Sequence, residues 1–291
     1  MVFIPCFLGN LTIKSGRKSA ETKNCMNQSF FRDKEIYYRV NVFQPSRSTL
    51  VFIHGLSGSS SSWAEYEKRF QDGYNILNFD LRGHGASKRW RKYTNYQIKF
   101  LADDLHDLVE HLNIQKFVLI AHSFGTLVAF EFIKNYPSLV EKVVFFSPDF
   151  YPRRRFFVRL MLPLLYCSRV FDFLPFSPKI GRHVDYYKFM NTYDWDPRRI
   201  FVDVSNTTLR SYLYCFLQSN MANYESFLGQ INVPVLIFHG KSDTFFPVSS
   251  GIIISRKIKN SKLILLEGDH FILFKKIDIV VSEIERFIAS V

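Results

Sequence analysis

One stretch, Lys116–Gly125, constrains the fold more than any other part of the chain. It begins with a run of apolar, β-forming residues of the kind found in a strand buried on both faces, and it ends in Ala-His-Ser-Phe-Gly, after which a helical pattern follows. A serine at an abrupt turn between a buried strand and a helix is the context required of a nucleophile elbow. Ala121 and Gly125 are small enough to give Ser123 the room for a strained backbone. An ordinary turn between a strand and a helix is the alternative interpretation of the same triplet.

Strand-like and helix-like segments alternate along most of the chain, which predicts βαβ units and an α/β fold with a mostly parallel sheet. After a hairpin within residues 30–43, strands are expected at 49–53, 74–79, 117–120, 140–146, 233–238 and 262–266, and helices at 63–71, 96–112, 126–136, 248–257 and 278–289.

The alternation stops after the sixth strand, where residues 150–230 are mostly helical in pattern and rich in aromatic residues. We expect this stretch to form a helical lid over the carboxyl edge of the sheet, where ligands bind in open α/β sheets. Residues 29–149 and 231–291 then form the core, and residues 1–28 form an irregular N-terminal leader.

The composition is that of a globular protein, with 47% hydrophobic and 22% charged residues among 291. Four cysteines without paired spacing predict neither a disulfide framework nor a zinc site, and they favour a reducing, cytoplasmic compartment. The apolar N-terminus is too short to span a bilayer and lacks the features of a secretory signal. A weak peripheral anchor is the alternative to an irregular leader.

The formal net charge of +12 is unevenly distributed. Basic residues gather between Leu81 and Phe100, with Trp90, Tyr93 and Tyr96 interleaved, and again at residues 153–155. The densest part of the first cluster is the basic strip Lys88–Lys92. No nucleic-acid-binding motif accompanies these clusters, so we expect no nucleic-acid partner. A solvated basic face is the plain interpretation, and peripheral contact with an anionic membrane, at its inner face, or with an anionic substrate is the alternative.

Two further polar residues follow strands in the order that a serine nucleophile needs. A serine hydroxyl reacts only when a base accepts its proton and a carboxylate orients that base. Ser123, Asp243 and His270 occur in the chain order expected of an α/β-hydrolase triad, and His270 lies between the last strand and the last helix. Asp149, which follows the preceding strand, is the rival acid.

Two backbone N–H groups must also stabilise the oxyanion of the reaction. We expect one from Phe124, directly after the serine, and the other from Leu56 in the His-Gly-Leu-Ser-Gly loop after an early strand.

Together these motifs resemble the α/β-hydrolase superfamily, in its lidded serine esterase/lipase-like branch. The resemblance is carried by L-V-F-I-H-G-L, N-F-D-L-R-G-H-G-A-S, L-I-A-H-S-F-G, L-I-F-H-G-K-S-D-T-F-F-P and G-D-H-F. It implies an eight-stranded, mostly parallel sheet, a Ser123–Asp243–His270 triad, and no metal or organic cofactor. A serine at the elbow argues against the branches that use aspartate there, the haloalkane dehalogenases and epoxide hydrolases. Alanine in place of the first elbow glycine is a departure from the usual pattern.

The expected reaction is hydrolysis of a carboxylic ester through an acyl-enzyme, with a small-molecule acyl ester as the partner. We expect the lid, Phe150–Gln230, to supply the substrate contacts. Within it, the apolar run Phe156–Tyr166 suits an acyl tunnel, with Phe156 and Leu160 as candidate contacts. This run equally suits contact with a membrane or packing onto the sheet.

Monoacylglycerol or lysolipid-like esters are therefore the expected substrates. Small soluble esters, thioesters, C–C bonds of diketones and a non-catalytic, ligand-binding role remain open alternatives.

Overall fold

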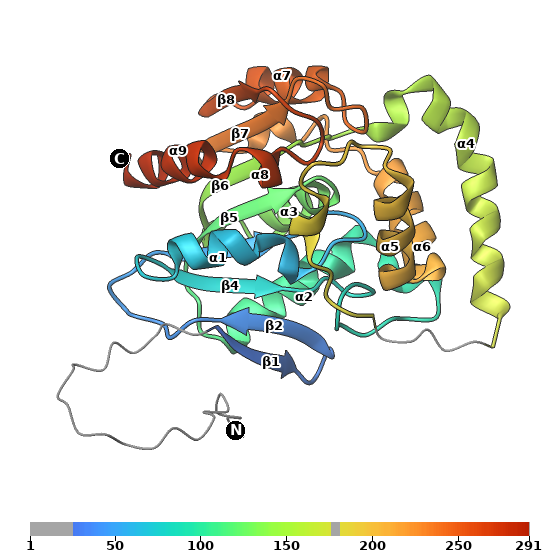
Figure 1. The fold of residues 1–291 in the computed structure, drawn as a ribbon, viewed down its shortest axis with the longest axis horizontal. Coiled ribbons are helices and arrows are strands. Elements are labelled where there is room, and N and C mark those ends of the chain that lie inside the picture. The colour runs from blue at the N-terminus through green and yellow to red at the C-terminus, as the bar shows by residue number, and fades with distance from the viewer. Residues whose placement is uncertain (1–25, 176–180, 291) are drawn as a thin grey trace.

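A computed structural model describes residues 26–175 and 181–290 of the chain. Its centre is an eight-stranded sheet with strand order β1-β2-β4-β3-β5-β6-β7-β8 (Figure 1). The first two pairings, β1 with β2 and β2 with β4, are antiparallel, and the remaining strands run parallel. The strands are β1 (Asn27–Phe31), β2 (Ile36–Val40), β3 (Thr49–Ile53), β4 (Asn75–Phe79), β5 (Phe117–His122), β6 (Val140–Phe146), β7 (Val235–Gly240) and β8 (Ser261–Leu266).

Helices cover both faces of the sheet, as expected when parallel strands are joined by crossover helices. They are α1 (Ala64–Phe70), α2 (Ile98–His111), α3 (Phe124–Asn135), α4 (Phe156–Tyr166), α5 (Pro197–Thr207), α6 (Leu209–Met221), α7 (Val248–Lys257), α8 (Ile272–Lys275) and α9 (Ile277–Ala289).

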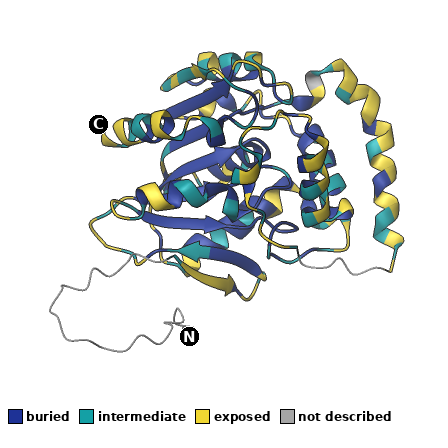
Figure 2. Ribbon diagram, in the orientation of Figure 1, coloured by how far each residue is buried: buried dark blue, intermediate teal, exposed yellow. Residues whose placement is uncertain are grey.

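Successive side chains of the central strands enter two different apolar cores. In β3, Val51 and Ile53 pack with α2, α3 and α7, whereas Leu50 and Phe52 pack with α1, α8 and α9. Because both faces are covered, every residue of β3, β4, β5 and β7 is buried (Figure 2). A fully buried aliphatic or phenylalanine side chain contributes about 1.5–3 kcal/mol to folding. The apolar strands predicted from the sequence are therefore the rigid frame that supports the site.

The α/β-hydrolase sheet expected from the sequence is confirmed, and the element bounds differ by a few residues. β7 starts at Val235 because Pro234 has no N–H to donate to a strand ladder, although its carbonyl accepts the Val143 amide. At the N-terminus, β1 starts at Asn27, so the last two residues of the expected leader belong to the sheet. The rest of that leader, apart from Met26, and the proposed N-terminal anchor lie outside the described residues.

Between β6 and β7 the chain forms a segment that we call the insert, residues 150–230, with α4, α5 and α6. Helices α5 and α6 pack against each other beside the carboxyl ends of the strands, and α4 lies at the outer side of α6 (Figure 1). Most of α4 is exposed, unlike the helices of the core (Figure 2). Among the helices described by the structure, none is long and apolar enough to cross a membrane.

Candidate active site

Ser123 occupies the sharp turn that joins β5 to α3. Its backbone has φ 52° and ψ −120°, a left-handed conformation that a residue with a side chain rarely adopts. Gly125 allows the turn, because a Cβ there would lie 2.6 Å from the His54 carbonyl oxygen at the end of β3. The serine is 8% exposed. The strand, turn and helix therefore form the elbow expected from the sequence.

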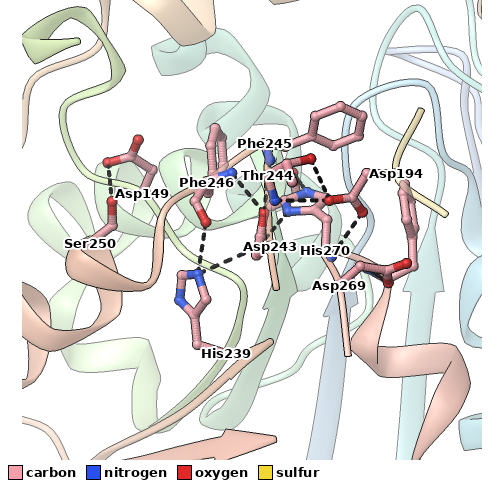
Figure 3. Close-up of polar contacts among 12 residues, drawn as sticks. Asp149, Asp194, His239, Asp243, Thr244, Phe245, Phe246, Ser250, Asp269 and His270 are labelled. Carbon is pink, nitrogen blue, oxygen red and sulfur yellow. Dashed lines mark hydrogen bonds and ion pairs between the residues drawn. The ribbon is translucent and has the colours of Figure 1, made fainter. Parts of the chain in front are cut away.

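The structure brings the three candidate catalytic side chains into one hydrogen-bonded row. Nε2 of His270 lies 2.6 Å from Oγ of Ser123, and Nδ1 of His270 lies 2.8 Å from Oδ2 of Asp243. The ring therefore donates its Nδ1 proton to the carboxylate and faces the serine hydroxyl with Nε2 as acceptor. The rival acid, Asp149, instead accepts the Phe150 amide and the Ser250 hydroxyl (Figure 3).

Asp243 is kept ionised although it is buried. Its Oδ1 accepts the amides of Phe245 and Phe246, at 3.0 Å and 2.8 Å. Burial by itself raises the pKa of a carboxyl, but His270 and His239 outweigh that effect and hold the pKa of Asp243 well below its ordinary range. A permanent negative charge therefore faces the ring of His270.

The loop after β3 lies directly against the serine. A Cβ at Gly55 would come within 3.2 Å of the Ser123 Cβ and within 2.9 Å of Nδ1 of His122, so only glycine fits. Leu56 follows immediately, and its amide meets no acceptor within the described part of the chain. Phe124 is the first residue of α3, so its amide has no acceptor inside the helix. Within the described residues, the two amides expected from the sequence to bind an oxyanion are therefore both without an acceptor.

Two buried histidines that the sequence pattern did not single out support this row. His122, beside the serine, donates from Nε2 to the His270 carbonyl oxygen at 3.1 Å. Burial and the neighbouring His270 lower the pKa of His122 to about 3, so it stays neutral. His239, at the end of β7, donates to the Phe246 carbonyl at 2.9 Å and lies 3.4 Å from Asp243. The only sequence signals of these roles are that His122 precedes a serine and His239 a glycine, each at the end of a strand.

The insert also reaches the row, through a residue that the sequence analysis missed. Asp194, between Tyr186–Phe189 and α5, accepts backbone hydrogen bonds from both Thr244 and His270 (Figure 3). No motif marks it, because the spacing of an irregular segment does not reveal its tertiary contacts.

Phe156 and Leu160, the candidate substrate contacts, do not line this site. They are 72% and 58% exposed on α4, and both side chains face solvent. The buried position of α4 is Leu162, which lies on the opposite side of the helix from both. Their assignment to an acyl tunnel is therefore wrong in this conformation.

The wider range expected to hold the substrate contacts, Phe150–Gln230, stays a prediction, and its two ends lie in different environments. Gln230 ends the short 3-10 turn Leu228–Gln230 that leads into β7, and it is exposed to solvent. Its side chain donates to the Ser226 carbonyl at 3.1 Å, so it is held within its own turn. At the other end, Phe150 is buried in the apolar core. Gln230 only marks the end of the range within which substrate contacts are expected, and that range stays a prediction.

The basic strip Lys88–Lys92 is not a continuous charged surface. Arg89 is buried and donates to three carbonyl oxygens, one of them that of Asn206 in the insert. Lys88 pairs with Glu35 and stacks on Trp90. Part of the positive charge of this strip therefore serves to fasten the insert to the core.

Comparison with known proteins agrees with this architecture. A family model described as the alpha/beta hydrolase fold matches residues 48–277. A Haemophilus influenzae protein named provisionally as an esterase/lipase is 26% identical over 247 residues, covering 82% of each chain. Human Epoxide hydrolase 4 is 23% identical over 275 residues, covering 87% of this chain and 75% of the human one.

Other relatives match over a shorter region or in fold alone. Epoxide hydrolase 1 of Caenorhabditis elegans is 36% identical over 95 residues, which are 33% of this chain and 24% of the nematode protein. The crystal structure of esterase RhEst1 from Rhodococcus sp. superposes with a TM-score of 0.65 at 19% identity, covering 91% of this chain and 98% of that one. The α/β hydrolase MGS-M2, from a deep-sea metagenome, superposes with a TM-score of 0.71 at 17% identity, covering 91% and 98%. The chain therefore belongs to the α/β-hydrolase fold family and is a hydrolase of that family.

Proposed function

We propose that this hydrolase cleaves carboxylic esters through an acyl-enzyme on Ser123. The observation that carries the proposal is the row formed by Ser123, His270 and Asp243, with contacts of 2.6 Å and 2.8 Å. A serine so placed beside a base and an orienting carboxylate is suited to acyl transfer. Esterase-like names among the relatives support the same reaction class.

In the first half of the reaction, Oγ of Ser123 attacks the ester carbonyl carbon while Nε2 of His270 takes the hydroxyl proton. The carbonyl oxygen becomes an oxyanion, which the amides of Leu56 and Phe124 bind. When the tetrahedral intermediate collapses, the C–O bond to the alcohol breaks and His270 returns the proton to the leaving alkoxide. The acyl group remains on Ser123.

In the second half, water replaces the alcohol. His270 takes a proton from the water, the resulting hydroxide attacks the acyl carbon, and the C–O bond to Ser123 breaks with return of the proton to Oγ. Asp243 stabilises the imidazolium in both halves, because its low pKa keeps the carboxylate charged. The cycle needs no group beyond these side chains, the two amides and water.

Epoxide opening is the second candidate, because several relatives bear epoxide hydrolase names. The branches of the superfamily that open epoxides use an aspartate at the elbow, whereas this chain has Ser123 there. The elbow residue therefore favours the ester.

A series of p-nitrophenyl esters tests the proposal. We expect turnover by the wild type and a loss of about six orders of magnitude in Ser123→Ala. Ser147→Ala is the matched control, because Ser147 also directly follows a strand, is fully buried and has a positive φ of 45°. Its hydroxyl has no partner in the described structure. A folded wild type that binds acyl ligands tightly without hydrolysing any ester would instead establish the non-catalytic, ligand-binding role. Cleavage of thioesters or of a C–C bond in preference to esters would overturn the substrate class.

For the substrate, we infer a long-chain acyl ester such as a monoacylglycerol or lysolipid, met at a lipid surface. Large apolar side chains are exposed along α4. A solvent-open cavity of about 760 Å³ lies on the Leu162 side of the same helix, with Arg153, Arg159 and Met221 among its lining residues. Exposed apolar patches of this kind mark interaction sites, and the adjacent arginines suit an anionic lipid head group. The exposed apolar residues of α4 are Phe156, Phe157, Leu160, Met161 and Leu164.

Sedimentation with vesicles checks this contact. We expect binding to anionic vesicles to exceed binding to neutral ones and to fall in Phe157→Ser, whereas Ile279→Ser, which changes an exposed apolar residue of α9, leaves it unchanged. Equal binding to both lipids, or equal loss in both variants, would contradict membrane contact through α4.

A further inference from the structure

Asp194 of the insert joins the two loops that carry the acid and the base of the proposed triad. Its Oδ1 accepts the amide of His270 at 2.9 Å. Its Oδ2 accepts the amide of Thr244, at 2.9 Å, and the Thr244 hydroxyl, at 2.7 Å. Thr244 directly follows Asp243, so one carboxylate holds the backbone next to the acid and that of the base itself (Figure 3).

We propose that Asp194 is a positioning residue, through which the insert sets the distance between Asp243 and His270. The inference rests on the proposed ester hydrolysis and goes beyond it, because it makes the insert part of the catalytic apparatus rather than a cover over it.

The geometry separates this role from that of the catalytic acid. Asp194 meets the backbone N–H of His270, whereas Asp243 meets the ring. Asp194 therefore moves no proton in the reaction and acts only through the loops it holds. At 3% exposure it is shielded from water, so its three hydrogen bonds face little competition from solvent.

The neighbours of Asp194 fasten it to the same loops from several sides. Trp195 donates from Nε1 to the Thr244 hydroxyl at 2.9 Å. Arg199, in α5, donates to the Asp194 carbonyl and lies 3.8 Å above the ring of Phe271, which follows the base.

Five residues after the base, Lys275 donates to the Thr192 carbonyl at 3.0 Å and pairs with Asp269, the residue before the base, at 2.5 Å. The segment from Thr192 to Arg199 is thus tied to His270 and to two residues that follow it, Phe271 and Lys275. Movement of this part of the insert would displace the base. Within the described residues, the exposed helix α4 makes no such contact with the base.

Steady-state kinetics of Asp194→Ala test the role. Loss of the carboxylate frees three donors and lets the two loops separate, and a misplacement of about 1 Å at a reacting group costs roughly 100-fold in rate. We expect kcat to fall about 10- to 100-fold with little change in KM. Asp194→Asn keeps one acceptor oxygen, enough for one loop, so its loss is intermediate.

Asp172→Ala is the matched control. Asp172 is also a carboxylate of the insert that joins it to the core, through the Tyr93 amide at 2.7 Å, and it holds the Tyr214 hydroxyl at 2.6 Å. In the described structure it contacts no loop of the triad. With all variants fully folded at the assay temperature, we expect Asp172→Ala to keep the wild-type kcat, and equal losses in Asp172→Ala and Asp194→Ala would overturn the proposal.

A second readout is independent of turnover. The proton that His270 shares with Asp243 gives a low-field NMR resonance, which Asp243→Asn identifies by its loss. We expect this resonance to shift or vanish in Asp194→Ala and to stay unchanged in Asp172→Ala. An unchanged resonance in Asp194→Ala would refute the positioning role, whereas a wild type with the resonance but without esterase activity would refute only the proposed function.

Discussion

Asp203 is a buried carboxylate of the insert, and its raised pKa can be tested through the pH dependence of unfolding. It lies in α5, 7% exposed, with Oδ2 at 3.2 Å from Nη1 of Arg199. Burial raises the pKa of Asp203 from its ordinary value of 3.8 to about 7, although Arg199 acts in the opposite direction.

The sign of the resulting pH dependence follows from proton binding. Between about pH 4 and pH 7 the folded protein keeps the Asp203 proton that the unfolded chain has lost, so the free energy of unfolding falls as pH rises. Below this window both states are protonated, and above it both are ionised. Each pKa unit is worth about 1.4 kcal/mol, so the full effect is about 4 kcal/mol.

Urea unfolding of wild type and Asp203→Asn from pH 4 to pH 8 measures this effect. Loss of the carboxylate that pairs with Arg199 changes the free energy of unfolding by the same amount at every pH. Loss of the titrating group changes how steeply the free energy of unfolding depends on pH. We therefore expect the difference in free energy of unfolding between the variant and the wild type to change by about 4 kcal/mol in favour of the variant as the pH rises from 4 to 7.5. Asp185→Asn, at an exposed carboxylate of the insert, controls for the charge change. Parallel curves for wild type and Asp203→Asn would refute the reasoning.

Two further predictions concern the site itself. Gly55→Ala places a Cβ 3.2 Å from that of Ser123, so we expect a loss of at least about 100-fold in kcat. The control is Gly73→Ala, where a Cβ meets nothing within 4 Å, and we expect it to keep full activity. An active Gly55→Ala would contradict the placement of the oxyanion loop. Asp243→Asn is expected to lower kcat about 10⁴-fold and Asp149→Asn by only a few fold, and the reverse order in the same ester assay would identify Asp149 as the acid.

The sheet and the row of three side chains were predictable because they depend on local patterns and on one rule of topology. Apolar runs such as residues 117–120 reveal buried strands. The carboxyl ends of parallel strands meet at one edge, so Ser123, Asp243 and His270 had to be brought near one another once their strands were identified.

The contributions of the insert were not predictable in the same way. Phe156 and Leu160 are as apolar as core residues, and only the packing of α4 through Leu162 shows that both face solvent. Asp194 lies in an irregular segment, and its hydrogen-bond partners are far along the chain, Thr244 at 50 residues and His270 at 76. Periodicity carries no information about such long-range pairing.

Labelling with a fluorophosphonate, followed by peptide mapping, tests most directly whether this row makes an activated nucleophile. We predict a single labelled residue, Ser123, with labelling absent in Ser123→Ala and strongly reduced in His270→Ala. Labelling at another serine, or equal labelling of wild type and Ser123→Ala, would contradict the central claim. A folded wild type that is not labelled at all would contradict it as well.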